Sequence, residues 1–398
     1  MVNKDWGFDT LAVHGSEGID PITGAVAPPI YQSSTFAFKN SEHGEKLFKG
    51  EAEGYIYSRL GNPTEDCLER EMAFLEGGEA ALAFASGMGA EAALILTLCG
   101  AGDNYLSSVT VYGGTHAMNL NFMPRFGIEV REVRATHVDE IEAAIDSKTK
   151  LLFIETPAKP TLDIIDIRAC AKIAQRHGIP LVVDNTFATP ALQQPLKLGA
   201  TVVVHSATKY IGGHGDTVAG LLVGPKDLMT RVRKETLNHV GSCISPFNAW
   251  LLLRGLKTLA VRVKRHCSNA MHVAQYLSFH PKIKAVYYPG LSFHPGHEIA
   301  RSQMSDFGGM LAFEIKGDRE DAKHVMDAVQ LCTLAVSLGD CDTLICHPAS
   351  TTQSSYSAQA LAEAGISETL VRLSVGIEDP RDICADLGQA LKVVERQG

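Results

Sequence analysis

Two short apolar runs, one ending at Asp184 and one leading to Lys209, constrain the fold of this chain more than any other feature. The runs are Pro180-Leu-Val-Val and Thr201-Val-Val-Val. Runs of this length, bounded by polar and Gly residues, are typical of strands buried on both faces of a parallel sheet. Ligands of such sheets bind at the carboxyl ends of the strands. We therefore expect four polar residues to meet in one crevice: Asp184, Ser206, Thr208 and Lys209.

A carboxylate and a lysine at neighbouring strand ends suit the cofactor pyridoxal phosphate (PLP). A lysine holds this cofactor as a Schiff base, and a carboxylate partners its pyridinium nitrogen so that the ring can accept electrons. Ser206 and Thr208, just before the lysine, would donate hydrogen bonds to the phosphate. The alternative interpretation is a structural salt bridge between Asp184 and Lys209 at the strand ends.

The motifs around the lysine favour the PLP site over the structural salt bridge. They are VVDNTFATP at 182–190, SATK at 206–209 and GGHGD at 212–216. Further matching blocks extend from AVHG at 12–15 to VRLSVGIED at 371–379 and so cover nearly the whole chain. Together they resemble the Cys/Met-metabolism family of PLP-dependent enzymes. That family includes cystathionine γ-synthase and γ-lyase, O-acylhomoserine sulfhydrylases and methionine γ-lyase.

The resemblance implies an α/β fold, the PLP-dependent transferase fold type I, which is aspartate-aminotransferase-like. Such a fold has a mostly parallel sheet of the seven-stranded type and a smaller C-terminal α/β domain. The strand and helix alternation up to Gly220 agrees with it, and 398 residues suggest two to three domains. We expect an N-terminal arm at 1–61, a large PLP-binding domain at 62–255 and a C-terminal domain at 256–398.

The N-terminal arm has few periodic signals, and we expect it to be extended and to contact a neighbouring subunit. By resemblance, Tyr57 and Arg59 bind the cofactor phosphate of that neighbour, which requires at least a dimer. The family is usually tetrameric, as a dimer of active dimers. A second phosphate contact is the turn Ser86-Gly87-Met88, because it opens an apolar helix whose first N–H groups attract an anion.

The resemblance also assigns the chemistry. Lys209 moves protons at the substrate, Asp184 holds the cofactor ring, and Tyr112 stacks on that ring and is the candidate proton donor to a leaving group. Arg372 supplies the planar bidentate donor that a substrate carboxylate needs, with Ser337 assisting. These roles predict elimination at Cγ of an amino acid.

Substrate choice rests on three departures from the methionine γ-lyases, which the segments SPFNAWLLLRGLKTL, AVSLGD and HPAS otherwise resemble. Gly114 stands where those enzymes carry a cysteine, and Asn238-His239 where they carry Lys-Asp. Lys159 stands where the family commonly has Asn. Polar changes beside a substrate discriminate sharply, although surface drift also explains Asn238-His239.

Three functions therefore stay open. The first is α,γ-elimination from a methionine-like amino acid. The second is γ-elimination from cystathionine, homocysteine or a γ-halogenated amino acid, for example chloro-allylglycine to an alkyne amino acid. The third is γ-replacement on an O-acylhomoserine. A non-catalytic cofactor-binding protein would have lost Lys209 or Arg372, and both are present.

Composition argues against several other classes of protein. A net charge of −9 without a basic block argues against a nucleic-acid partner. No run reaches the roughly 18 apolar residues of a membrane span. The nine dispersed cysteines have neither C-x-x-C nor zinc-type spacing, so we expect no metal and reduced thiols in the cytoplasm.

Overall fold

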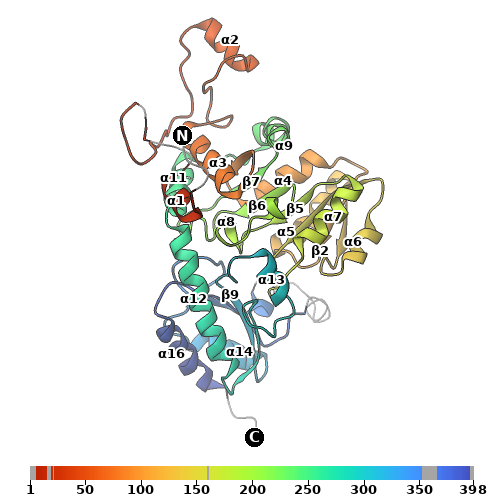
Figure 1. Cartoon of the computed structure of the whole chain (residues 1–398), viewed down its shortest axis with the longest axis vertical. Helices are drawn as coiled ribbons and strands as arrows, with labels where there is room; N and C mark the ends of the chain where they lie inside the picture. Colours follow the sequence, from red (N-terminus) through yellow and green to blue (C-terminus); the bar gives the residue numbers. More distant parts are fainter. Residues whose placement is uncertain (1–5, 16–18, 21, 159–160, 352–364, 395–398) are drawn as a thin grey trace.

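The computed structural model describes residues 6–15, 19–20, 22–158, 161–351 and 365–394. The described chain builds a seven-stranded sheet from residues 80–224 and a five-stranded sheet from residues 283–374. In Figure 1 the two sheets with their helices lie one above the other, and the long helix α12 runs along one side of the lower part.

The seven-stranded sheet has the order β1-β7-β6-β5-β4-β2-β3. Its strands from β3 to β6 pair in parallel, and β7 runs antiparallel to both β1 and β6. This confirms the predicted mostly parallel sheet. The bounds are β1 Ala80–Phe84, β2 Asn104–Ser108, β3 Glu129–Val133, β4 Thr149–Glu155, β5 Leu181–Asp184, β6 Val202–Ser206 and β7 Gly220–Gly224.

Helices connect these strands and cover the sheet. Local signals set their ends: the Asp166 side chain caps α7 by accepting from the Ala169 N–H, and Gly178 ends it in a left-handed conformation. The helices of this part are α3 Pro63–Glu76, α4 Gly87–Leu98, α5 Gly113–Asn121, α6 Val138–Ala144, α7 Ile167–His177, α8 Thr189–Leu192, α9 Lys226–Val232, α10 Asn238–Val240 and α11 Pro246–Leu256.

The five-stranded sheet has the order β10-β11-β12-β9-β8 and is mostly antiparallel. Its strands are β8 Ile283–Tyr287, β9 Met310–Ile315, β10 Thr333–Leu334, β11 Leu344–Cys346 and β12 Leu370–Ser374. Apolar residues of the sheet and of its helices form one buried cluster. These helices are α12 Leu259–Ser278, α14 Arg319–Ala328 and α16 Pro380–Ala390. The buried Ala300 of α13 His297–Gln303 belongs to a different apolar cluster.

The N-terminal segment is not wholly extended, so that part of the prediction is wrong. It contains α1 Phe8–His14 and α2 Ser41–Lys49, and Figure 1 shows α2 projecting from the top of the molecule. Local chemistry explains α2. The Asn40 side chain accepts from the His43 N–H at its start, Gly50 is left-handed at its end, and Lys46 pairs with Glu42 one turn away.

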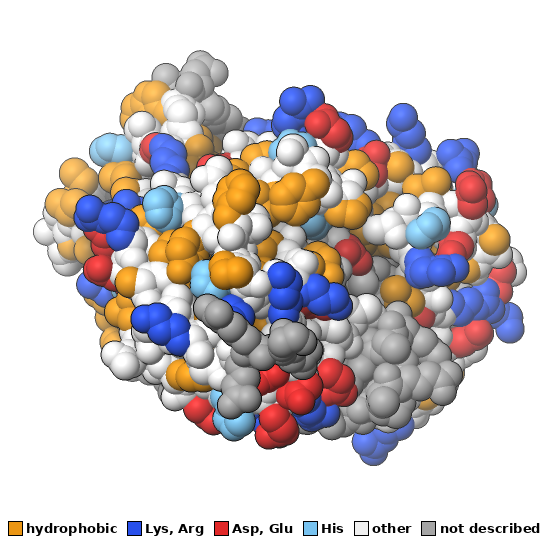
Figure 2. Space-filling model, turned by 90° about the horizontal axis from the view of Figure 1, so that it is seen from below, with side chains coloured by type: hydrophobic (Ala, Val, Ile, Leu, Met, Phe, Trp, Pro, Cys, Tyr) orange, Lys and Arg blue, Asp and Glu red, His pale blue; other side chains and the backbone are white. Residues whose placement is uncertain are grey.

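The surface carries charges of both signs. Figure 2 shows Lys and Arg side chains interspersed with Asp and Glu on the face seen from below. Among the described residues, no helix combines the length and the apolar character that crossing a bilayer requires.

Candidate active site

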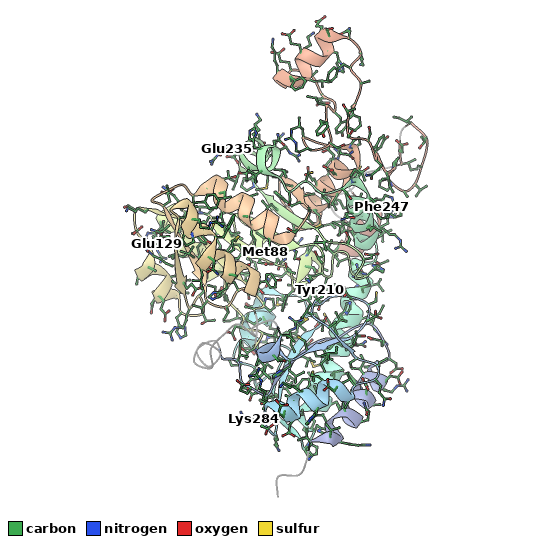
Figure 3. All side chains as sticks on the ribbon, turned by 180° about the vertical axis from the view of Figure 1, so that it is seen from behind. Met88, Glu129, Tyr210, Glu235, Phe247 and Lys284 are labelled. Carbon is green, nitrogen blue, oxygen red and sulfur yellow. The ribbon has the colours of Figure 1, made fainter. Side chains whose placement is uncertain are left out.

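Ten of the predicted site residues line one cavity at the carboxyl ends of β4, β5 and β6. Its volume is about 1060 Å³, including space open to solvent. Met88 at the start of α4 and Tyr210, next to Lys209, both lie near the middle of the molecule in Figure 3. The ten residues are Ser86, Gly87, Met88, Tyr112, Asp184, Ser206, Thr208, Lys209, Ser337 and Arg372.

Lys209 lies in the turn that follows β6, and its Nζ donates a 2.8 Å hydrogen bond to Ser337 Oγ. Burial lowers the pKa of Lys209; the nearby Asp340 carboxylate opposes this effect, and the Arg372 guanidinium adds to it. A lowered pKa increases the fraction of neutral amine, the form that attacks a carbonyl and accepts a proton.

Asp184 is the last residue of β5 and is 5% exposed. Its Oδ1 accepts from the Thr186 N–H at 2.9 Å. β5 pairs with β4 so that Asp184 lies beside Glu155, the last residue of that strand. Two buried carboxyl groups thus stand at adjacent strand ends and line the same cavity.

The start of α4 forms a backbone cradle. Ser86 caps this helix by accepting from the Gly89 N–H at 3.0 Å. A Cβ at Gly87 would lie 3.0 Å from Ser206 Cα and Cβ, so the two backbones approach closely because residue 87 is glycine. The first N–H groups of a helix have no intrahelical acceptor and favour an anion.

Tyr112 lies directly before α5 and is 44% exposed. Its backbone N–H donates to Glu155 Oε2 at 2.6 Å. A Cβ at Gly114 would lie only 2.5 Å from Tyr112 Cε1. Glycine at this position therefore leaves room for the tyrosine ring as it is placed.

Arg372 and Ser337 face Lys209 from the C-terminal part. Arg372 lies on β12 and is 6% exposed, and its Nη2 donates to the Ser337 carbonyl at 2.9 Å. Its buried Nε has no hydrogen-bond partner among the described residues. Ser337 adopts a φ of 95°, a strained value for a residue with a side chain. An unpaired donor on a buried guanidinium suits a ligand carboxylate.

The remaining described residues of the prediction do not line this cavity. Tyr57 and Arg59 are exposed, Arg59 donates to the Asn238 carbonyl, and its guanidinium lies 5.8 Å from the Tyr57 ring centre. The described residues that line the cavity do not include Gly114, Asn238 or His239. Lys159 lies outside the described residues. The proposed substrate roles of these four residues stay predictions.

Seven further residues line the cavity that we did not predict from the sequence. Glu155 could have been found, because it ends a strand beside Asp184. Glu91 had a weaker signal, as the one charged residue of α4. The seven are Glu91, Glu155, Thr186, Phe187, Val218, Val336 and Leu338.

Comparisons with known proteins match nearly the whole chain. The family model described as Cys/Met metabolism PLP-dependent enzyme matches residues 9–392. The chain is 49% identical over 396 residues to an L-methionine gamma-lyase from Fusobacterium nucleatum subsp. polymorphum, covering 99% of this chain and 100% of the relative.

Two more matches carry other names. An O-succinylhomoserine sulfhydrylase from Pseudomonas aeruginosa is 43% identical over 384 residues, which cover 96% of this chain and 95% of that protein. A solved structure of a putative O-acetylhomoserine (thiol)-lyase from Campylobacter jejuni, with N'-pyridoxyl-lysine-5'-monophosphate, has a TM-score of 0.94 and 39% identity. It covers 97% of this chain and 100% of that chain.

Proposed function

Because the chain belongs to the Cys/Met metabolism family of PLP-dependent enzymes, we propose that it is a lyase that catalyses γ-elimination from a sulfur-containing or related γ-substituted L-amino acid. The observation that carries this proposal is the placement of Lys209, Asp184, Tyr112 and Arg372 around one cavity. The 49% identity to an L-methionine gamma-lyase supports methionine-like substrates first.

The residues of the cavity fit PLP. Gly87 leaves space for a close approach to the start of α4, which suits the phosphate, with Ser206 and Thr208 beside it. Lys209 offers a desolvated amine for the aldehyde, and Asp184 a buried carboxylate for the ring nitrogen. When bound, the cofactor supplies an electron sink for charge that develops at the substrate carbons.

The protein residues then have separate roles in substrate binding and proton transfer. Arg372 binds the substrate carboxylate through its guanidinium, and Ser337 holds both Arg372 and Lys209 in place. Lys209 removes the proton at Cα, releases it and, as a neutral amine again, removes one at Cβ, while Tyr112 donates a proton to the atom that leaves Cγ. For methionine the products are methanethiol, ammonia and a four-carbon 2-keto acid, with one water consumed.

γ-Replacement on an O-acylhomoserine is the second candidate, favoured by the 43% identity to an O-succinylhomoserine sulfhydrylase. The same residues would serve it, because both reactions share the steps at Cα, Cβ and Cγ. They differ in whether a sulfur nucleophile or water completes the turnover.

Purified protein incubated with PLP tests the proposal directly. We expect a visible absorption band from the cofactor linked to Lys209, and its loss in Lys209→Ala. The substrate panel is methionine, cystathionine, homocysteine, a γ-chlorinated amino acid, and O-acetylhomoserine with sulfide, scored for ammonia, keto acid and released group. Absence of the band in the wild-type protein would overturn the proposal. Products only from O-acetylhomoserine with sulfide would favour the second candidate.

We propose a homo-oligomer in which Tyr57 and Arg59 complete the phosphate site of a partner, as a dimer of active dimers. Their exposure on the N-terminal segment supports this. Arg59→Ala and Lys209→Ala should each be inactive alone, and co-expression should restore activity, because one site of each mixed dimer keeps both residues. No recovery in a verified mixed dimer would contradict shared sites.

None of the nine cysteines, all of which lie within the described residues, forms a disulfide. Six of them are buried, and the thiols fit a reducing compartment. We therefore propose a cytoplasmic location. Cell fractionation with an antibody to the protein tests it.

A further inference from the structure

Glu91 is a carboxyl group that the proposed mechanism does not use. It lies on α4, one turn after the Ser86-Gly87-Met88 cradle, and is 3% exposed. It lines the same cavity as Asp184. Its Oε2 accepts a 2.7 Å hydrogen bond from Thr115 Oγ1. A carboxyl group at this depth needs either a cation or a proton.

The groups that act on Glu91 favour the proton. Burial raises the pKa of Glu91 well above its usual value, the Asp184 carboxylate raises it further, and Glu155 adds a smaller effect in the same direction. The Thr115 hydroxyl acts in the opposite direction. These neighbours come from β5, β4 and α5, and the cations of the cavity are Lys209 and Arg372. Burial and these two carboxylates therefore favour the protonated form of the Glu91 side chain over its charged form.

We propose that Glu91 is a positioning residue that holds a proton beside Asp184, so that a carboxyl pair, not Asp184 alone, faces the ring nitrogen of the cofactor. This inference rests on the proposed PLP function. Two carboxyl groups that interact strongly share their protons, so one of the pair is charged while the other is neutral. Glu91 then ionises when the negative charge of Asp184 is removed, for example in Asp184→Asn.

A purely structural role for Glu91 makes a different prediction. If Glu91 only accepts the Thr115 hydrogen bond, replacing it has the same effect whether or not Asp184 is present. If the two form a pair, the effect of replacing Glu91 depends on Asp184, because removal of the Asp184 charge is what ionises Glu91. A double-mutant cycle separates these cases.

The test measures the PLP dissociation constant of substrate-free protein at neutral pH for wild type, Glu91→Gln, Asp184→Asn and the double variant. Gln keeps an oxygen that can accept from Thr115 and imitates the neutral acid. We expect Glu91→Gln to bind within about twofold of wild type, Asp184→Asn about tenfold more weakly, and the double variant about another tenfold more weakly than Asp184→Asn.

A second readout follows the visible spectrum of the bound cofactor against pH. The spectrum of Asp184→Asn should change with pH as Glu91 titrates, and that change should be missing in the double variant. Thr115→Val, which removes the hydroxyl that donates to Glu91 Oε2 and, at 3.9 Å, to Met88 Sδ, is the matched structural control and should leave the cycle intact.

The outcomes separate the two proposals. If wild-type protein does not bind PLP, the proposed function fails. If wild-type protein binds PLP and Glu91→Gln changes the dissociation constant equally in both backgrounds, only the role of Glu91 is overturned. Thermal unfolding of the cofactor-free variants checks that all four proteins are folded.

Discussion

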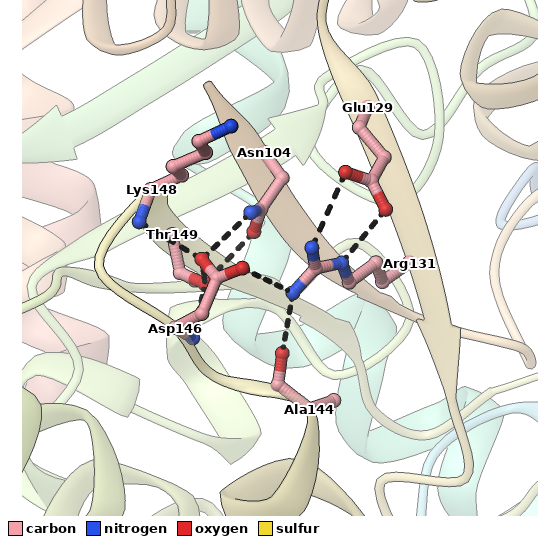
Figure 4. A network of polar contacts seen from close by, with 7 residues as sticks. All are labelled: Asn104, Glu129, Arg131, Ala144, Asp146, Lys148 and Thr149. Carbon is pink, nitrogen blue, oxygen red and sulfur yellow. Dashed lines mark hydrogen bonds and ion pairs between the residues drawn. The ribbon is translucent and has the colours of Figure 1, made fainter. Parts of the chain in front are cut away.

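The two ends of the seven-stranded sheet use polar residues in opposite ways. At the amino ends of β2 and β4, and on β3, charged groups satisfy one another. Arg131 donates to both carboxylate oxygens of Glu129, to Asp146 and to the Ala144 carbonyl, as Figure 4 shows. In the cavity at the carboxyl ends, Arg372 of β12 keeps an unpaired Nε, and Glu91 of α4 has two carboxylates as its electrostatic neighbours.

The pKa directions express the same contrast. The pKa of Asp146 lies well below its usual range because Asn104, the Lys148 N–H and Arg131 all donate to it. The pKa of Glu91 is raised, and that of Lys209 is lowered. In Figure 3 Glu129 lies at the outer edge of the molecule, whereas Met88 lies near its middle. The outer network around Arg131 and Asp146 stabilises the fold. The central cavity holds groups with shifted pKa values, as is typical of a ligand-binding site.

The largest expected effect separates activity from stability at the carboxyl end. Lys209→Met should lower kcat/KM by about 10⁴-fold or more, because the reacting amine is lost. The free energy of unfolding of the cofactor-free protein should not fall, because Met removes a desolvated amine and keeps a similar volume. Denaturant unfolding and turnover assays check both. A clear loss of stability would make Lys209 part of the structural framework and weaken the comparison.

Arg372→Lys tests whether the unpaired Nε matters. A lysine keeps the charge but cannot bind a carboxylate in a planar bidentate manner, so we expect kcat/KM to fall about 10- to 100-fold, chiefly through a higher KM. Arg381→Lys, an exposed pair partner of Asp379, is the matched control. If both variants keep wild-type kinetics, the substrate carboxylate binds elsewhere.

The sequence predicts the carboxyl-end site well where the signals are local. Asp184 and Lys209 follow apolar runs, and a parallel sheet brings such strand ends together, so ten predicted residues do line one cavity. Glu155 obeys the same rule, because it ends β4 beside Asp184. Helix α2 was missed although its caps are local, because the surrounding segment has no core-facing periodicity.

Other features depend on packing between distant segments, which a single sequence does not encode locally. The burial of Glu91 results from the packing of α4 against α5, β6 and β7. The unpaired Nε of Arg372 depends on where β12 lies relative to Ser337. The exposure of Tyr57 and Arg59 follows no local sequence signal, and their role in the site of a partner subunit is predicted only through the family resemblance.

At the amino ends, Asn104→Ala should act on stability without affecting activity. Asn104 is buried, accepts from Thr149 Oγ1 at 2.8 Å and donates to Asp146 Oδ1 at 2.9 Å. Removing it leaves buried polar groups unpaired, so we expect the free energy of unfolding to fall by about 1–3 kcal/mol. Asn121→Ala, an exposed residue, is the control. A fall in kcat similar to the fall seen for the cavity variants would show that the two ends are coupled.

The smallest expected effect is the acid dependence of the outer network. Because the folded state holds the pKa of Asp146 below its unfolded value of about 3.9, its contribution to stability is present above that pH and is lost as the pH falls further. Asp146→Asn should therefore unfold with a shallower dependence on pH below about 4, whereas the exposed Asp327→Asn should follow the wild type. Salt should reduce the difference, because the carboxylate and Arg131 are partly exposed. If the unfolding free energies of wild type and Asp146→Asn depend on pH equally at low salt, the ion pair and hydrogen bonds of Asp146 contribute nothing measurable to stability. The contrast between the two ends of the sheet then rests on Asn104 alone.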